Sequence, residues 1–171
     1  MRWIVLAALV IVVFLGTLVV IQSRPGTAVR KKQEAFIVGI ERRSPARMRR
    51  LIGEEYGDKW GFTRDDAIEA MLDAGSQFLV MVVESEEEAF VRDGPLVVIT
   101  TVLTVGGTPV GPGANEVMRR VNQLRKPFVF TWEKESFLPN SWRLVQIDNE
   151  DLPEELYGYE PGDFRRAMRG E

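Results

Sequence analysis

The chain has 171 residues and a formal net charge of only −3 at pH 7, and it contains neither cysteine nor histidine. These absences exclude disulfide bonds, thiol nucleophiles, thiolate metal sites and any catalysis or zinc binding by histidine within this chain. We therefore predict no metal site and no cofactor. The residues after the first hydrophobic stretch are enough for one domain of ordinary size with its own core.

That first stretch, residues 3–21, consists of nineteen uncharged and mostly apolar residues. A helix needs about 20 such residues to cross the hydrocarbon core of a bilayer. Its β-branched residues would form a helix poorly in water, but lipid leaves the backbone no other way to satisfy its hydrogen bonds. We predict a single transmembrane anchor over residues 1–22.

Two alternatives to a permanent anchor stay open. A cleaved signal peptide usually has a shorter apolar segment, of about 7 to 15 residues, followed by a small-x-small site. The nearest such site here is Gly26-Thr27-Ala28. The second alternative is a buried core helix, which would need a surrounding shell more apolar than the rest of this chain offers.

Basic residues gather directly after the hydrophobic run. Residues 24–50 carry nine basic and two acidic side chains, whereas residues 51–171 carry 12 basic and 23 acidic ones. Because anionic lipid attracts basic segments close to a membrane, we expect lipid contact from the residues nearest the anchor, in or beside a short linker over residues 23–30. These residues are Arg24, Arg30, Lys31 and Lys32. They outnumber Arg2 and the terminal amino group on the other side of the run, which predicts a cytoplasmic domain.

The next segments have helical periodicity. Apolar residues predict helices at about residues 29–43, 45–55 and 64–75. Ser44-Pro45 has the form of an N-cap followed by proline in the first turn, and Thr63 with Asp66 resembles a capping box. The arginines between residues 42 and 50 are predicted to form a solvated helix face, and nucleic-acid binding through them is not expected.

The period then falls to two, which is typical of strands. Residues 96–105, rich in β-branched side chains, predict a central strand, and residues 128–133 with 141–147 predict a final hairpin. Shorter strands are expected at 78–83 and 89–92, a charged turn or strand end at 84–88, a tight turn at 93–95, a loop at 106–114, and helix or strand at 115–125. Residues 149–171 predict an acidic surface tail, attached by Tyr157 and Tyr159.

The three helices, the antiparallel strands and a last hairpin that reads Phe-Thr-Trp-Glu-Lys and then Ser-Trp-Arg-Leu-Val-Gln-Ile resemble the nuclear transport factor 2-like (NTF2-like) superfamily. The resemblance covers residues 31–148. It implies an α+β cone, in which three helices fill the concave side of a curved antiparallel sheet.

Some members of that superfamily are isomerases or dehydratases that use an aspartate with a tyrosine or histidine inside the cone. Without histidine, the resemblance implies a tyrosine–aspartate site. The candidates in this chain are Tyr56, Asp58 and Asp66, and the other available residues are Asp65, Tyr157 and Tyr159. Carboxylates at the start of a helix and in turns also have structural roles. Trp60 and Trp132 could line a cone cavity or serve as packing residues.

Other members with a membrane attachment serve as scaffolds. The first functional hypothesis is therefore a membrane-anchored interaction, scaffold or sensor domain without catalysis, whose partners are the bilayer and a protein or second copy. The alternative is a small-molecule-binding or isomerase/dehydratase-type enzyme. That alternative requires an apolar cavity that holds an isolated acid.

Overall fold

The computed structural model describes residues 25–136, 138 and 140–170. The predicted anchor over residues 1–22 lies outside these ranges, and no helix within them is both long and apolar enough to cross a membrane. The described elements confirm the α+β class. In chain order they are α2 (Pro25–Glu41), α3 (Pro45–Leu51), α4 (Arg64–Ser76), β1 (Phe78–Asp93), β2 (Leu96–Pro109), α5 (Gly113–Asn122), β3 (Phe128–Lys134), β4 (Trp142–Asp148), the 3₁₀ helix η1 (Leu156–Gly158) and α6 (Asp163–Arg169).

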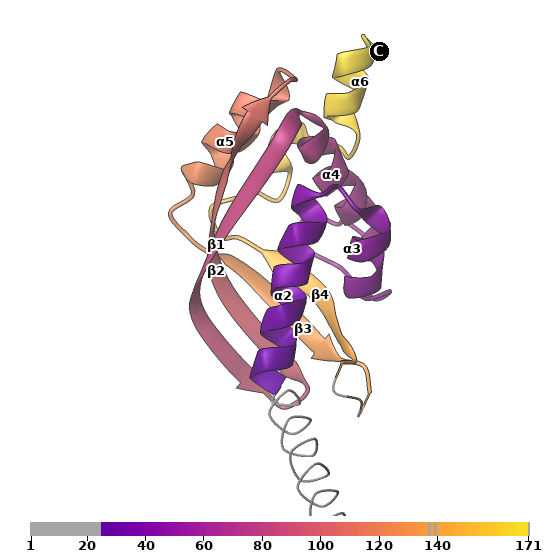
Figure 1. Ribbon diagram of the computed structural model, residues 1–171, viewed down its shortest axis with the longest axis vertical. Coiled ribbons are helices and arrows are strands. Elements are labelled where there is room, and N and C mark those ends of the chain that lie inside the picture. The colour runs from indigo at the N-terminus through magenta and orange to yellow at the C-terminus, as the bar shows by residue number, and fades with distance from the viewer. Residues whose placement is uncertain (1–24, 137, 139, 171) are drawn as a thin grey trace, which may run out of the picture.

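The four strands form one antiparallel sheet in the order β1-β2-β3-β4. Strand β2 is central, as its β-branched sequence predicts. The hairpin of β1 and β2 is much longer than that of β3 and β4, and it bends past the shorter pair (Figure 1). Strand β1 bulges between Phe78 and Val80. Next to the bulge, Gly107 pairs with Met81 and has φ 135°, and a Cβ there would lie 2.0 Å from the Val80 carbonyl oxygen. Only glycine fits there.

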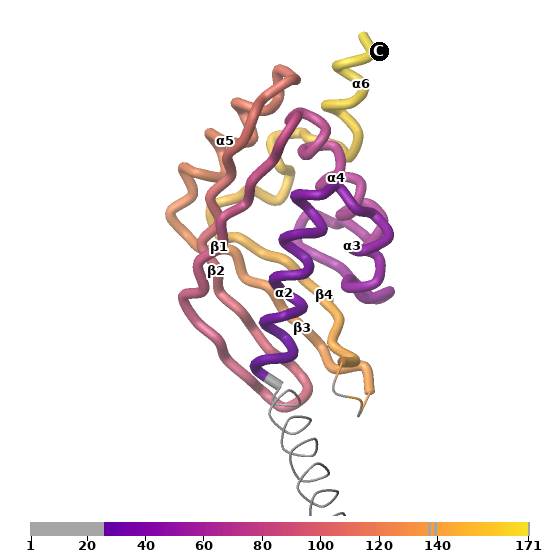
Figure 2. The backbone as a smooth tube through the Cα atoms, viewed as in Figure 1, coloured from indigo at the N-terminus to yellow at the C-terminus, as the bar shows by residue number. Residues whose placement is uncertain are grey.

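Helices α2, α3 and α4 lie on one side of the sheet, with α2 running lengthwise (Figures 1 and 2). The core lies between these layers and holds the largest fully buried side chains, which come from helix and sheet alike: Phe36, Met48, Ile52, Phe78, Ile99, Phe130, Trp132, Trp142 and Leu144. The ring centroids of Phe36 on α2 and Phe130 on β3 are 6.1 Å apart in an edge-on contact. Large aromatic side chains bury much apolar area each, which helps a small domain to form a core.

Several local predictions hold. Thr63 and Asp66 form a reciprocal capping box at the start of α4, with Asp66 Oδ2 accepting from the Thr63 backbone N–H at 3.0 Å. That hydrogen bonding, from the Thr63 hydroxyl and N–H, holds the pKa of the Asp66 carboxyl below its usual value. Proline lies in the first turn of α3, and the final hairpin is present as β3 and β4.

Three predictions are corrected. The expected linker over residues 23–30 is helical from Pro25 onward. Residues 84–88 neither turn nor end the strand but continue β1, because residues 84–87 pair with β2 and the side chains of residues 84–88 are exposed. The expected surface tail contains η1 and α6 and is fastened to α4 (see below).

The free edge of β1 is covered by side chains of α2 and the turn after it. Glu41 accepts the Val83 backbone N–H at 2.9 Å, and Arg43 donates to the Phe78 carbonyl at 2.8 Å. Near the start of α2, Arg30 makes a two-pronged ion pair with Glu87, with a shortest distance of 2.7 Å. The Glu41 and Arg43 contacts satisfy backbone groups that an uncovered edge strand would offer to another chain.

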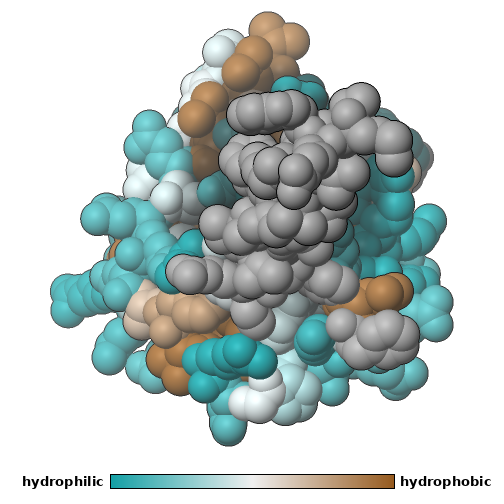
Figure 3. All heavy atoms as spheres, turned by 60° about the horizontal axis from the view of Figure 1, so that its bottom comes forward, coloured by the Kyte–Doolittle hydropathy of each residue, from teal (hydrophilic) through white to brown (hydrophobic). Residues whose placement is uncertain are grey.

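The coloured part of the surface in Figure 3, seen from the end of the domain at which α2 begins, carries mostly hydrophilic side chains with smaller hydrophobic patches between them. The C-terminus lies at the opposite end (Figure 1). The start of α2 and helix α6 therefore lie at opposite ends of the long axis.

Candidate ligand site

An apolar cavity of about 280 Å³ lies between the helices and the sheet. We call it the sheet cavity. Its walls come from α2, the loop before α4, α4 itself, the three later strands and the segment after β4. The lining residues are Phe36, Ile40, Tyr56, Asp58, Trp60, Phe62, Ala67, Ala70, Met71, Ala74, Leu103, Phe128, Phe130, Ile147, Leu152 and Leu156.

Two of the predicted site residues meet in this cavity. The Tyr56 hydroxyl donates to Asp58 Oδ2 at 2.8 Å, and Asp58 Oδ1 accepts the backbone N–H groups of Trp60 and Phe62, both at 3.0 Å. Burial, followed by the nearby Asp58 charge, raises the pKa of the Tyr56 phenol above its ordinary value. Both carboxylate oxygens of Asp58 therefore hold the loop before α4.

The other predicted residues lie elsewhere. Asp66 and Asp65 stand at the start of α4, where Asp65 pairs with Arg49 at 2.8 Å. Trp60 lines the sheet cavity, but Trp132 is completely buried and donates its indole N–H to Gln33. Trp132 is therefore a packing residue. Within the described ranges no group of three potential metal ligands occurs.

The segment after β4 crosses the end of the helical layer, and we call residues 149–170 the strap. Asp73 of α4, whose side chain is 0% exposed, receives four hydrogen bonds from it. They come from the Tyr159 hydroxyl at 2.9 Å, the backbone N–H groups of Phe164 and Arg165 at 2.9 Å each, and Arg165 Nε at 3.1 Å. A buried carboxylate is stable only when it is paired in this way.

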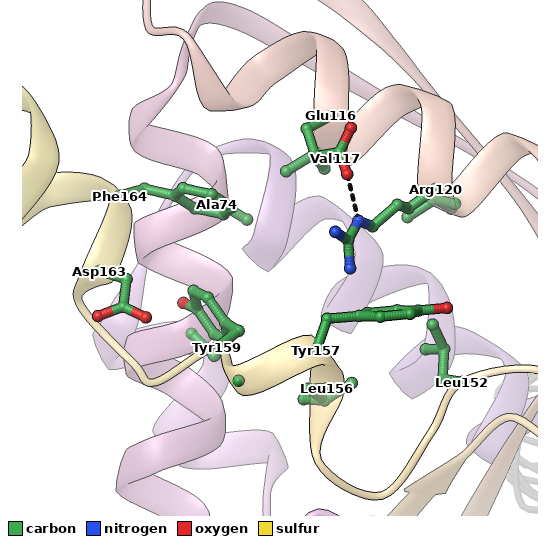
Figure 4. Close-up of a pocket in the computed structure, with 13 residues that line it drawn as sticks. Ala74, Glu116, Val117, Arg120, Leu152, Leu156, Tyr157, Tyr159, Asp163 and Phe164 are labelled. Atoms are coloured by element: carbon green, nitrogen blue, oxygen red, sulfur yellow. Dashed lines mark hydrogen bonds and ion pairs between the residues drawn. The ribbon is translucent and has the colours of Figure 1, made fainter.

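A second cavity, of about 430 Å³, lies where the strap meets α4 and α5. We call it the strap pocket (Figure 4). It shares Ala70, Ala74, Leu152 and Leu156 with the sheet cavity but includes no strand residue. Its remaining lining residues are Glu116, Val117, Arg120, Val121, Tyr157, Gly158, Tyr159, Asp163 and Phe164.

At the rim of the strap pocket the Arg120 guanidinium lies over the Tyr157 ring, 3.9 Å from its centroid, and pairs with Glu116 (Figure 4). Tyr157 is held in the left-handed region at φ 59°, between Leu156 at 41° and Gly158 at 76°. Two non-glycine residues in that region are a source of backbone strain. The strap thus turns sharply so that Leu156 points inward and Tyr157 meets Arg120.

The predicted lipid-contact residues differ in their surroundings. Arg24 lies outside the described ranges, and Arg30 is paired with Glu87 and stacked 4.2 Å from the Phe90 ring centroid. Lys31 is exposed, whereas Lys32 is half-buried, and burial lowers its pKa. Of the described three, Lys31 is the most accessible to an external anion.

The predicted attachment through Tyr159 is present, since its hydroxyl donates to Asp73. Sequence reasoning missed Asp73, Arg120 and the strap residues other than Tyr157 and Tyr159. Asp73 sits in a predicted helix among alanines, where a single acid is ordinarily solvated. The only sequence signal for the strap is its aromatic residues, Tyr157, Tyr159 and Phe164, which a disordered acidic tail would lack.

Solved structures resemble this fold at low sequence identity. A conserved protein from Planctomyces limnophilus DSM 3776 is 15% identical with a TM-score of 0.56, over 72% of this chain and 93% of that one. Bd1075 of Bdellovibrio bacteriovorus is 9% identical with a TM-score of 0.53, over 71% of this chain but only 38% of that one. A five-substitution variant of Rd1NTF2_05 is 9% identical with a TM-score of 0.50, over 72% of this chain and 96% of that one.

These likenesses support the NTF2-like fold that the sequence predicts, and at such identities they show the fold alone. No protein-family model matches the sequence, and no curated protein matches it. Because this fold carries many unrelated activities, function has to be argued from the site.

Proposed function

We propose that this protein is a membrane-anchored NTF2-like domain that acts by binding, as an interaction, scaffold or sensor module, and not by catalysis. The anchor is the apolar run over residues 3–21, and the basic residues after it favour a cytoplasmic domain. The distribution of charge adds to this, because the part of the chain nearest the anchor is basic and the remainder is acidic.

The observation that carries the non-catalytic part is the bonding of Asp58. A general acid or base must exchange its proton with a substrate, within hydrogen-bond reach. Asp58 instead accepts the Tyr56 hydroxyl and two backbone N–H groups, and Tyr56 has donated its only proton. The pair holds the loop of residues 58–62 in shape, which explains its presence without any reaction.

A second candidate function, reversible binding of a small molecule, is favoured by the two adjoining cavities. Their volumes, about 280 and 430 Å³, are close to the range of small-molecule sites, and their walls are largely apolar. An isomerase- or dehydratase-type enzyme would additionally need an acid in the cavity with an unoccupied oxygen, and Asp58 does not supply one.

Membrane attachment is tested by alkaline extraction of cell membranes. We expect the full chain to stay in the pellet and a chain that begins at Ser23 to be released. Protease added to right-side-out cells or spheroplasts should leave the domain intact if it is cytoplasmic. Digestion from outside would reverse the assigned side, and extraction of the full chain by alkali would refute the anchor.

Catalysis is tested through the Tyr56–Asp58 pair. We expect Tyr56→Phe and Asp58→Asn to lower the unfolding temperature, because each removes a bond that holds the loop. If any turnover is found, loss of that turnover in Tyr56→Phe without a change in unfolding temperature would favour the enzyme.

A further inference from the structure

We propose that the strap pocket binds a small molecule that has an apolar body and one anionic group, with the anionic group held by Arg120. This inference rests on the proposed function, since it names the ligand class of a binding domain, but it does not depend on the anchor. The pocket adjoins the sheet cavity, with which it shares four lining residues, but α4, α5 and the strap form all of its walls.

The interior of the strap pocket suits an apolar body. On α4 the residues that face it are only Ala70 and Ala74, whose small side chains leave room, and Val117 and Val121 of α5 lie opposite. The aromatic rings of Tyr159 and Phe164, with centroids 5.3 Å apart, close one end (Figure 4). Water in such a space gains few hydrogen bonds, so an apolar group displaces it favourably.

The walls are fixed before any ligand binds. Asp73 holds Tyr159, Phe164 and Arg165 in place through its four hydrogen bonds, and Arg165 also pairs with Glu69 at 2.7 Å. A preformed pocket avoids the loss of conformational entropy that ordering a loop on binding would require.

The rim of the strap pocket favours an anion. Glu116 accepts bonds from both Arg119 and Arg120, so this group of three side chains has a net charge of +1. The hydrogen bond from Arg119, followed by the one from Arg120, lowers the pKa of the Glu116 carboxyl to about 2. This carboxyl is therefore ionised at neutral pH. Of the three side-chain nitrogens of Arg120, only Nε has an acceptor among the described residues. The two terminal nitrogens point into the pocket (Figure 4). Those nitrogens can bind a carboxylate or phosphate.

The same rim disfavours a cation. The face of Tyr157, which could otherwise stack on an ammonium group, is covered by the Arg120 guanidinium. The other carboxylate of the lining, Asp163, is paired with Arg166 and accepts the Glu160 backbone N–H. No lining acid is left without a partner within the described part of the chain.

The test uses the full chain in nanodiscs of zwitterionic lipid, with dodecanoate that carries a terminal diazirine as the probe. After photolysis, mass spectrometry of peptides should locate the probe on α5 or on residues 152–164. Unlabelled dodecanoate should compete, and dodecanol should compete roughly tenfold or more weakly because it lacks the charge. Dodecyl phosphate serves as a further competitor. Stronger competition from it than from dodecanoate would identify a phosphate-bearing lipid as the source of the anionic group.

Three variants make the test specific. Arg120→Gln should weaken competition by dodecanoate roughly tenfold, whereas Arg125→Gln, which removes a positive charge from the same surface outside the pocket, should leave it within about twofold. Val121→Phe fills the interior and should abolish labelling with Arg120 intact. Unfolding temperatures check that each variant is folded.

Labelling that avoids α5 and the strap, equal competition by dodecanol, or equal effects of Arg120→Gln and Arg125→Gln would each overturn this inference. None of these results bears on membrane retention after alkaline extraction or on the Tyr56–Asp58 pair. Failure of the strap pocket is therefore distinguishable from failure of the proposed function.

Discussion

The indole N–H of Trp132 donates to Oε1 of Gln33 at 2.9 Å, and both side chains are buried. This bond joins α2 to the middle of the sheet. Gln33→Leu should lower the free energy of unfolding by about 1 to 3 kcal/mol, because it leaves a buried donor without a partner. Chemical denaturation of a chain that begins at Ser23 measures the effect. The combined loss in Gln33→Leu with Trp132→Phe should be smaller than the sum of the two single losses, and strictly additive effects would contradict the bond.

Trp142 anchors the final hairpin and is 1% exposed. Trp142→Ala should reduce the free energy of unfolding by about 3 to 5 kcal/mol through the cavity that it leaves. Val91→Ala is the control, since Val91 is 58% exposed and should change stability by less than about 0.5 kcal/mol. A Trp142→Ala variant that melts with the parent would show that this side chain is misplaced.

The strap depends on one buried carboxylate. Asp73→Ala should destabilise the domain by about 3 kcal/mol or more, because it leaves the Tyr159 hydroxyl, Arg165 Nε and two backbone N–H groups without their acceptor, although Arg165 keeps its pair with Glu69. Limited trypsin digestion should then cut first within the strap, at Arg165 or Arg166. Asp65→Ala, at an exposed acid of the same helix, should leave the digestion pattern unchanged.

Two of the three tyrosines in the chain should resist ionisation while it is folded. Burial raises the pKa of both Tyr56 and Tyr159, and the hydrogen bond to Asp73 adds to the effect for Tyr159. Unfolded tyrosine has a pKa of about 10, so the free energy of unfolding should fall as the pH rises beyond that value.

We expect the phenolate absorbance of these two side chains to appear together with the loss of near-ultraviolet circular dichroism. Tyr56→Phe and Tyr159→Phe should each reduce the absorbance step that accompanies unfolding. Full ionisation of all three phenols before the dichroism changes would contradict the buried hydrogen bonds.

Lipid contact should depend more on Lys31 than on Arg30. A chain that begins at Ser23 should bind anionic vesicles at low salt and be released at high salt, since screening weakens the attraction. Lys31→Gln should weaken sedimentation with the vesicles more than Arg30→Gln, because Arg30 is already paired with Glu87. Binding that does not respond to salt would refute contact through these residues.

The elements predicted correctly have local causes. The capping box of Thr63 and Asp66 involves residues three apart, and the alternation in β3 and β4 reflects one buried face of each strand. Tyr56 and Asp58 could likewise be named as candidates for one site from the sequence, because they are only two residues apart.

The failures have distant causes. Residues 84–88 look like a turn or strand end because they are charged, yet pairing with β2 keeps this part of the chain extended while the side chains stay exposed. The strap lacks a clear apolar period, and its position depends on hydrogen bonds to Asp73, more than 80 residues earlier in the chain. The strap pocket could not be predicted for the same reason, since its three walls come from separate parts of the sequence.

The long contact between α2 and β1 also has a mechanical consequence. Its bonds are spread from Arg30 with Glu87 to Arg43 with the Phe78 carbonyl, so tension applied at residue 25 along the helix axis loads them together in shear. Tension at the C-terminus would instead concentrate on the attachments at Asp73 and peel them one after another. A domain held by its amino end would therefore bear force along the sheet edge and yield first at the strap.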